Sequence, residues 1–148
     1  MSLRSAILLY LLYVFLVLIL PWYFCAKPVS AGKHFEHEAT YSKAWCDSQF
    51  GFNEVKLFDN SRVDCLLDVY AIETDFADKA WKEGIGQALW YALVTRRNPG
   101  VLVIVETADD CRYVKRVHAI ARWTHPTIHV WETGPAAGTC QMSDGDLE

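Results

Sequence analysis

Residues 62–75 read RVDCLLDVYAIETD, two short apolar segments that run into acidic residues. Each segment, 62–67 and 69–75, has the length and the apolar content of a buried or half-buried β-strand. The turn near Asp68 predicts that the two strands pair as a hairpin, which would bring Asp64 and Glu73 to one end of the sheet. Glu73 and Asp75 are two residues apart, so their side chains should share a face of the strand.

Regular elements are predicted on both sides of this hairpin. Before it we expect a helix and a strand, and after it helix, strand, helix and strand. This order, α-β-β-β-α-β-α-β, predicts an α/β fold with a mixed central sheet and helices on both faces. The predicted elements are helix 34–48, strand 53–58, strands 62–67 and 69–75, helix 78–94, strand 101–105, helix 110–123 and strand 127–131.

The first residues of the chain have the pattern of a targeting segment. Arg4 precedes an unbroken apolar run at 6–20, and small residues follow at Val29-Ser30-Ala31. This order is typical of a secretory signal peptide. An uncleaved membrane anchor that contacts the bilayer through 6–24 is the alternative, because the run approaches the length that spans ~30 Å of hydrocarbon. Pro21 favours cleavage, and either interpretation of 1–31 predicts export, to the periplasm or medium or to the membrane surface.

Composition divides the remaining chain into a domain at 32–133 and a flexible, acidic, Gly-rich tail at 134–148. The chain has 148 residues, which is one domain's worth, and its apolar fraction of 52% suffices for a packed core. All 18 acidic residues but only 12 of the 14 basic residues lie beyond position 32. Because that part is acidic, it cannot bind nucleic acid through its bulk charge alone, and such binding would require a local basic face or a metal ion.

Four cysteines remain if the leader is removed, namely Cys46, Cys65, Cys111 and Cys140. An even number of cysteines in an exported domain is typical of disulfides, and no spacing matches a zinc site. A Cys46–Cys65 bridge is the pairing we expect, with reduced, buried thiols as the alternative.

Asp64, Glu73 and Asp75 would repel one another if they converged beside buried strands, unless a cation neutralised them. Two or three carboxylates suit Mg²⁺, or Mn²⁺, which keeps several waters and binds substrate phosphates. The alternative is that all three are solvated acids at strand ends. Spacing alone does not separate these two interpretations.

The element order and two short motifs resemble the PD-(D/E)XK nuclease superfamily over about 34–131. Arg62-Val63-Asp64 stands where that family has its first acidic residue, and Glu73-Thr74-Asp75 stands where it has (D/E)-x-K. The stretch 62–92 also looks like a group of small uncharacterised proteins assigned to the superfamily. The resemblance implies a restriction-endonuclease-like fold, Mg-dependent cleavage of phosphodiesters, DNA rather than RNA as the partner, and pairing into a homodimer as in many of these enzymes.

The resemblance also implies roles for individual residues. Asp64, Glu73 and the main-chain carbonyl of Thr74 would hold the metal ion, supported by Glu38 on the first helix, for which Glu36 is the alternative. The lysine of the third motif position is replaced by Asp75, so Lys79 or Lys82 on the next helix would act in its place, with Lys79 the nearer. Gln87 would lie on the same helix face as Lys79 and point to the site.

Two other functions stay open. Asp75 in place of the lysine, together with the acidic net charge, favours a catalytically inactive nuclease-fold binding domain of the cell envelope. A small disulfide-containing envelope protein with no nucleic-acid role is the second alternative. Side chains for phosphate contacts are available at Arg96, Arg97, Arg112, Lys115, Arg116 and Arg122.

Overall fold

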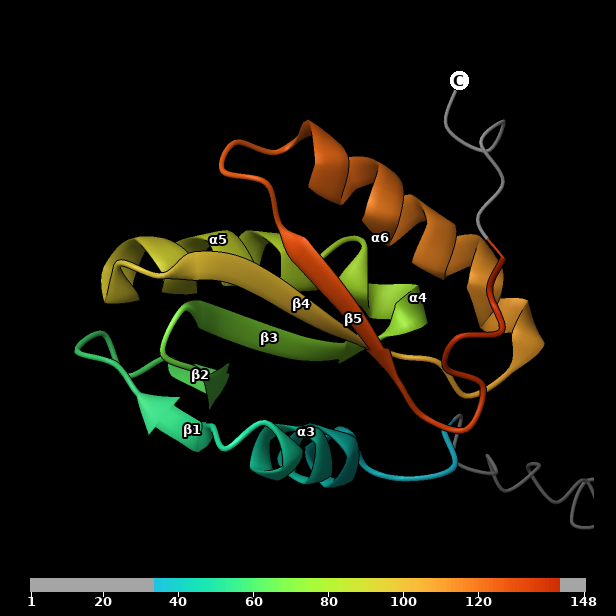
Figure 1. The fold of residues 1–148 in the computed structure, drawn as a ribbon, viewed down its shortest axis with the longest axis horizontal. Coiled ribbons are helices and arrows are strands. Elements are labelled where there is room, and N and C mark those ends of the chain that lie inside the picture. The colour runs from blue at the N-terminus through green and yellow to red at the C-terminus, as the bar shows by residue number, and fades with distance from the viewer. Residues whose placement is uncertain (1–33, 142–148) are drawn as a thin grey trace, which may run out of the picture. The chain divides into compact units, whose positions relative to one another are not determined.

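The computed structural model describes residues 34–141, so the predicted leader or anchor and the end of the predicted tail lie outside the described residues (Figure 1). The described chain alternates helices and strands in the predicted order, except that one predicted helix is two. The elements are α3 (Glu38–Ser48), β1 (Phe52–Lys56), β2 (Arg62–Leu66), β3 (Tyr70–Phe76), α4 (Ala77–Ala80), α5 (Gly84–Thr95), β4 (Asn98–Ile104), a short 3₁₀ helix η2 (Ala108–Asp110), α6 (Cys111–Trp123) and β5 (His129–Thr133).

The five strands form one mixed sheet in the order β1-β2-β3-β4-β5. β1, β2 and β3 are an antiparallel meander, whereas β4 and β5 run parallel to β3. The pairing of β3 with β4 is continuous from Tyr70–Asn98 to Phe76–Ile104, which makes these two strands the rigid centre of the sheet. The predicted mixed α/β architecture is confirmed.

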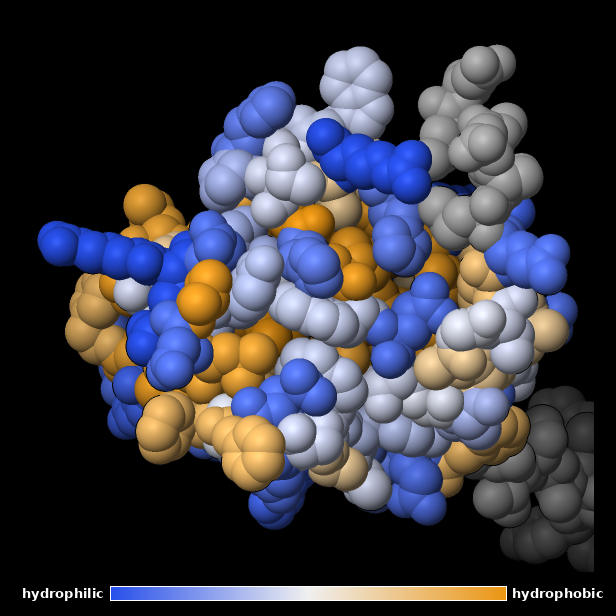
Figure 2. Space-filling view, viewed as in Figure 1, coloured by the Kyte–Doolittle hydropathy of each residue, from blue (hydrophilic) through white to orange (hydrophobic). Residues whose placement is uncertain are grey.

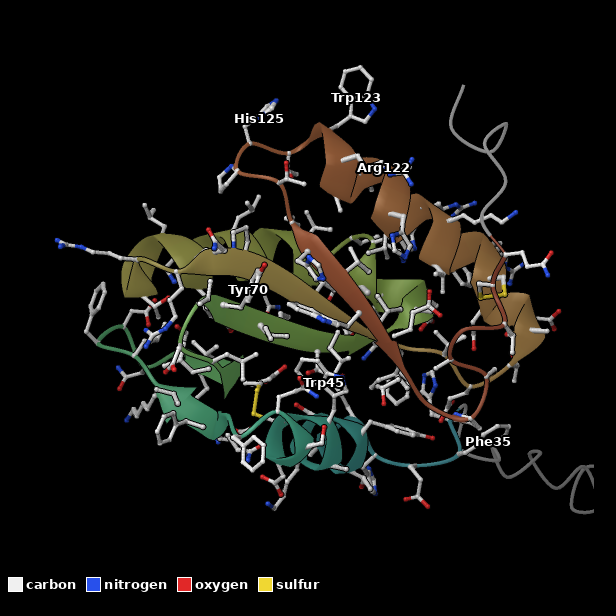
Figure 3. All side chains as sticks on the ribbon, in the orientation of Figure 1. Phe35, Trp45, Tyr70, Arg122, Trp123 and His125 are labelled. Carbon is white, nitrogen blue, oxygen red and sulfur yellow. A yellow bond between two sulfur atoms is a disulfide. The ribbon has the colours of Figure 1, made fainter. Side chains whose placement is uncertain are left out.

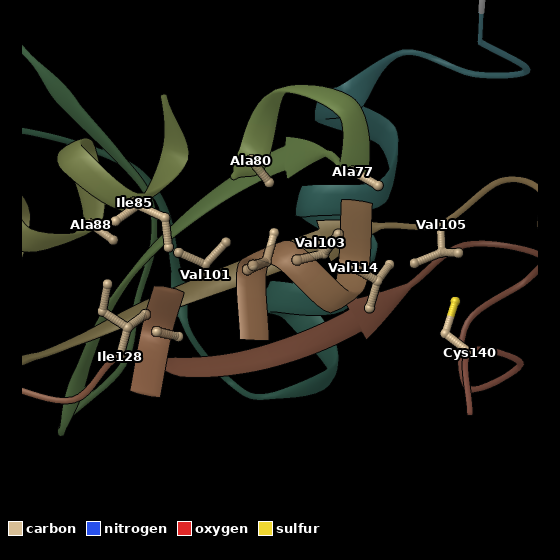
Figure 4. Packing of buried hydrophobic residues seen from close by; sticks show 12 residues of the cluster. Ala77, Ala80, Ile85, Ala88, Val101, Val103, Val105, Val114, Ile128 and Cys140 are labelled. Carbon is tan, nitrogen blue, oxygen red and sulfur yellow. The ribbon is translucent and has the colours of Figure 1, made fainter. Parts of the chain in front are cut away.

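Helices cover both faces of the sheet (Figure 1). On one face, α3 packs through Cys46 onto a buried cluster with Cys65, Ile72 and Leu102. On the other face, α4, α5 and α6 pack onto the valines of β4 (Figure 4). Because side chains alternate along a strand, Ile72 faces α3 while its neighbours Ala71 and Glu73 face the other way.

An aromatic cluster covers the part of the α3 face nearest β5. Trp131 lies 5.4 Å from Trp45 and 5.1 Å from Tyr70, measured between ring centroids, so it packs between the two rings labelled in Figure 3. On the surface seen in Figure 2, apolar side chains are visible in the middle of the face, and hydrophilic side chains surround them. Aromatic rings therefore cover this part of the sheet.

The helix predicted over 78–94 is interrupted. α4 ends at Ala80, and the backbone N–H groups of Lys82 and Glu83 both donate to the carbonyl of Lys79, at 2.8 and 3.0 Å. α5 then begins at Gly84. Glycine weakens a continuous helix by about 1 kcal/mol, and Gly84 and Gly86 together favour a break here. The prediction of one helix was therefore wrong.

The first helix begins at Glu38, not at 34 as predicted. The carboxylate of the buried Glu106, just beyond β4, accepts hydrogen bonds from the backbone N–H of Phe35 at 2.8 Å and the hydroxyl of Tyr41 at 3.1 Å, and one of its oxygens lies 2.9 Å from Nδ1 of His34. The N–H of Phe35 thus bonds a side chain and not a helical carbonyl, and residues 34–36 form a bend before α3.

Two disulfides cross-link the domain. Cys46–Cys65 joins α3 to β2, as predicted, and Cys111–Cys140 joins α6 to the segment after β5. Cys140 is buried, so the folded part continues beyond the predicted boundary at 133. In the part of the chain from 34 to 141, no helix is long and apolar enough to cross a bilayer.

Candidate functional site

Asp64 lies where β2 and β3 separate. The paired residues of these strands are Leu66–Ala71 and Cys65–Ile72, and at the next position the backbone N–H of Thr74 donates a 2.7 Å hydrogen bond to Oδ2 of Asp64. The side chain of Asp64 therefore takes the place of the neighbouring strand. On the other side of β2, Glu54 has a φ of 53° between the pairs Asn53–Cys65 and Val55–Val63, which marks a local distortion of β1 opposite Asp64.

Glu73 meets Asp64 at this opening. The two carboxyl groups share a hydrogen bond, which requires a proton on one of them. Glu73 is only 7% exposed, and its Oε2 is buried with no hydrogen-bond partner among the described residues. Burial raises the pKa of Glu73 far above its usual range, and the charges of Asp64, Asp75 and Glu38 raise it further. These effects favour the proton of the pair on Glu73.

A second pair of carboxyl groups adjoins the first. Glu38 at the start of α3 is hydrogen-bonded to Asp75 on β3. Burial, reinforced by the charge of Glu38, raises the pKa of Asp75 to about 7. Desolvation also raises the pKa of Glu38. The ammonium group of Lys79 on α4 opposes these shifts at both residues.

These groups come from four elements that meet at one end of the sheet. Asp64, Glu73 and Glu38, which the sequence singled out, come together there with Lys79 close enough for its charge to act on two of the carboxyl groups. Next to Asp64 the surface is hollowed by a cavity of about 230 Å³ lined by Ala39, Ser42, Lys43, Asn53, Glu54 and Asp64. Asp64 is thus reachable from outside, whereas Glu73 is enclosed.

Thr74 has a structural role that the sequence did not indicate. Its hydroxyl lies 2.9 Å from the hydroxyl of Ser42 on α3, and both are buried. Together with the bond from its N–H to Asp64, this contact fixes the end of β3 against α3 and holds Asp64 at the opening.

Gln87 is on α5, not on one continuous helix with Lys79, so the shared helix face that we predicted does not exist. Its Oε1 accepts a 3.3 Å hydrogen bond from the hydroxyl of Tyr91. Tyr91 is buried, and burial together with the charges of Glu73 and Asp64 raises its pKa to about 12. Tyr91 is a site neighbour that our reading of the sequence missed, although its i,i+4 spacing from Gln87 was the available signal.

The two glycines of α5 differ in their surroundings. A Cβ on Gly84 would lie 3.8 Å from Cγ of Glu73 and 3.7 Å from Cβ of Asp75, which is ordinary contact. A Cβ on Gly86 would meet nothing within 4 Å. Neither glycine is therefore required by close packing, and Gly84 is the one that lies next to the two acids.

The described residues contain no ready-made centre of three or more His, Cys, Asp or Glu side chains for a metal ion. Mg²⁺ does not require one, because it is commonly bound by one or two carboxylates, with waters and substrate phosphates completing the shell. The unpaired buried oxygen of Glu73 beside the carboxylate of Asp64 fits such an ion. The negative charges of Asp64, Asp75 and Glu38, which disfavour ionisation of Glu73 and which a cation would offset, fit such an ion as well.

Compared with known proteins, the chain matches no family model, no curated protein and no solved structure.

Proposed function

We propose that this domain is a metal-dependent phosphodiester hydrolase of the PD-(D/E)XK type, a nuclease acting on DNA rather than RNA. One observation carries the proposal: Asp64 and Glu73 meet where β2 and β3 part, and a buried oxygen of Glu73 has no partner there. An acid pair kept out of water and short of hydrogen bonds is costly unless a cation or a proton compensates it. The restriction-endonuclease-like assignment of the fold is part of the same proposal.

Asp64 and Glu73 would hold Mg²⁺ or Mn²⁺, with the main-chain carbonyl of Thr74 as a third ligand and Glu38 supporting the shell. A bound ion supplies polarisation of a phosphoryl oxygen and a lower pKa for a coordinated water. Glu73 must lose its proton before it can serve as a ligand, so metal affinity should rise with pH.

Lys79 takes the place of the lysine that the motif lacks. It is exposed on α4, and its charge already acts on Glu38 and Asp75. An ammonium group in that position can orient a water and stabilise negative charge on a phosphate. Asp75, with its pKa near 7, is partly protonated at neutral pH, which lowers the repulsion that a phosphate would meet at this position.

Tyr91 and Gln87 are positioning residues in this proposal. The Tyr91 hydroxyl donates to Gln87, and its raised pKa keeps it protonated and neutral beside the two acids. The exposed Gln87 amide is then free to donate to a phosphate oxygen.

We also propose that the protein is exported. The two disulfides, Cys46–Cys65 and Cys111–Cys140, support this because such bonds persist in oxidising compartments.

A plasmid-nicking assay on the purified full chain tests the hydrolase. We expect relaxation of supercoiled DNA with Mg²⁺ or Mn²⁺ and none with EDTA, and slower cleavage of an RNA of matched length. Glu73→Gln should lower the rate of cleavage by more than about 100-fold. Glu36→Gln, which alters an exposed acid near α3, should leave the rate unchanged. Cleavage that survives Glu73→Gln would mean contamination.

The second candidate function is that of a catalytically inactive nuclease-fold binding domain of the cell envelope. It is favoured by Asp75, which stands at the position where the motif has lysine. Absence of cleavage with either ion, together with absence of ion binding, would establish that candidate and contradict the hydrolase.

A further inference from the structure

Basic side chains on α6 and in the turn after α4 contact two aromatic rings. The ring of Trp81 is contacted by the ammonium of Lys82, 5.2 Å from its centroid, and by the guanidinium of Arg116, 4.9 Å from it. The ring of Tyr113 is contacted by the guanidinium groups of Arg116, at 5.5 Å, and Arg112, at 4.6 Å. Cation–π contacts of this kind hold long side chains in place at the surface.

Together with Lys79, the residues in these contacts form a basic row that consists of Lys79, Lys82, Arg116 and Arg112. Lys79 and Lys82 are joined by the turn in which the N–H of Lys82 donates to the carbonyl of Lys79, and α4 packs against α6. All four cations are exposed. One end of the row, Lys79, is the residue whose charge acts on Glu38 and Asp75, so the row begins at the candidate site.

The charge of this surface differs from that of the rest of the domain. α6 carries Arg112, Lys115, Arg116 and Arg122 and has no acidic residue, in a domain that is acidic overall. The nearby Asp110 accepts bonds from the backbone N–H groups of Glu106 and Thr107, so it is committed to closing the turn before α6. The row is thus the local basic face that an acidic protein needs in order to bind a polyanion.

We propose that the basic row binds the phosphodiester backbone of DNA and guides a strand to the carboxyl groups. This assignment rests on the proposed hydrolase function. An anionic bilayer fits less well, because a helix that lies on a membrane inserts an apolar face. Val114, Val117 and Ala121 of α6 are buried in the core instead, and of the large apolar side chains of this helix Trp123 alone, at its end, is exposed.

Binding without cleavage tests the row. The full chain in mild detergent is titrated into a short labelled DNA duplex, and into the matching single strand, with EDTA present at several salt concentrations. Arg112→Gln combined with Arg116→Gln should weaken binding by about tenfold or more at low salt. The slope of log affinity against log salt should become smaller by about 2.

Two controls accompany it. Lys56→Gln combined with Arg96→Gln removes the same charge from β1 and from the end of α5 and should leave the slope unchanged. Arg112→Lys combined with Arg116→Lys keeps the charge and should retain most of the affinity, which separates loss of binding from loss of the fold. Equal losses in the two Gln pairs, or no loss in either, would overturn the assignment.

A vesicle assay tests whether the basic row binds an anionic membrane instead of DNA. If the Arg112→Gln, Arg116→Gln pair lowered binding to phosphatidylserine vesicles, relative to phosphatidylcholine vesicles, and left DNA binding intact, the row would be a membrane surface and the proposal would fail. DNA binding that depends on the row, in a protein that does not cleave DNA with Mg²⁺ or Mn²⁺, would contradict the hydrolase and not the binding surface.

Discussion

The backbone N–H of Thr74 donates to the carboxylate of Asp64 at 2.7 Å, a side-chain bond at a position where a strand would usually supply a carbonyl. This replacement of a backbone carbonyl by the Asp64 carboxylate ends the pairing of β2 with β3 and leaves an opening between the two strands. Through that opening Asp64, at a cavity, meets Glu73, which is enclosed under α5. The same contact thus creates both the gap in the sheet and the acid pair within it.

The stability of the protein without divalent ions should fall as pH rises. Glu73 and Asp75 have raised pKa values in the folded state, so the fold keeps protons that the unfolded chain releases above its ordinary values of 4.5 and 3.8. Because the unfolded state then binds fewer protons, the free energy of unfolding decreases as the pH rises. The contribution of Asp75 to this decrease ends near its folded pKa of about 7, and the contribution of Glu73 continues to higher pH. Thermal melts in EDTA should show a Tm lower at pH 8 than at pH 5 by about 5 °C or more.

Glu73→Gln is the matched variant for this prediction. A glutamine imitates the protonated side chain, so much of the pH dependence should disappear, and added Mg²⁺ should stabilise the parent at pH 8 but not the variant. Glu36→Gln should melt like the parent. An equally steep pH dependence in Glu73→Gln would show that other groups cause it.

Lys79→Met should lower kcat by about 10²- to 10⁴-fold and leave metal affinity nearly unchanged, because the lysine acts on water and phosphate rather than on the ion. Lys82→Met should instead raise KM, since Lys82 lies in the basic row. Lys56→Met on β1 serves as the control for loss of a lysine. Steady-state cleavage at several DNA concentrations separates these effects. If Lys82→Met lost kcat while Lys79→Met did not, the assignment of the two lysines would be reversed.

The Cys46–Cys65 disulfide should support the site as well as the fold. It ties the helix that carries Glu38 to the residue next to Asp64, across a sequence separation of 19. Cys46→Ala combined with Cys65→Ala should cost about 3 kcal/mol of unfolding free energy and weaken Mn²⁺ binding in the remaining folded protein. Cys111→Ala with Cys140→Ala should also lower stability, but its Mn²⁺ affinity should match the parent. Equal Mn²⁺ affinity in both pairs would count against a link between the first disulfide and the site.

Gly100 should not tolerate a methyl group. A Cβ there would lie 2.7 Å from the ring of Trp131 and 2.9 Å from Cγ1 of Ile72, at the centre of the sheet. Gly100→Ala should therefore lower the free energy of unfolding by about 1–3 kcal/mol. Gly86→Ala, with open space around it, should raise stability by about 0.5–1 kcal/mol. Chemical denaturation of the two variants against the parent measures both, and a Gly100→Ala variant as stable as the parent would contradict this packing.

The order of elements could be predicted from local patterns because the run at 101–105 and the alternation at 62–75 are strong signals of strands. The position of Asp64 near Glu73 followed from the same hairpin. Sequence reading also anticipated the Cys46–Cys65 bridge. These features depend on neighbours in the chain or on one adjacent strand.

Other features depend on contacts that span the whole domain. The start of α3 is set by Glu106, which is 71 positions from Phe35, and no local signal in 34–48 reveals it. The break between α4 and α5 was indicated by Gly84 and Gly86, but the amphipathic pattern across it favoured one helix. Nothing in the sequence around Tyr91 sets it apart from other buried aromatic residues, and only its position beside Glu73 and Asp64 connects it with the site.

Calorimetric titration of the full chain with Mg²⁺ at pH 8, in two buffers of different ionisation enthalpy, tests the central claim most directly. Because Glu73 carries a proton in the folded protein, we predict that binding of one ion releases about one proton to the buffer. Glu73→Gln should release none and bind much more weakly. Binding without proton release, or identical binding by Glu73→Gln, would contradict a metal site at Asp64 and Glu73.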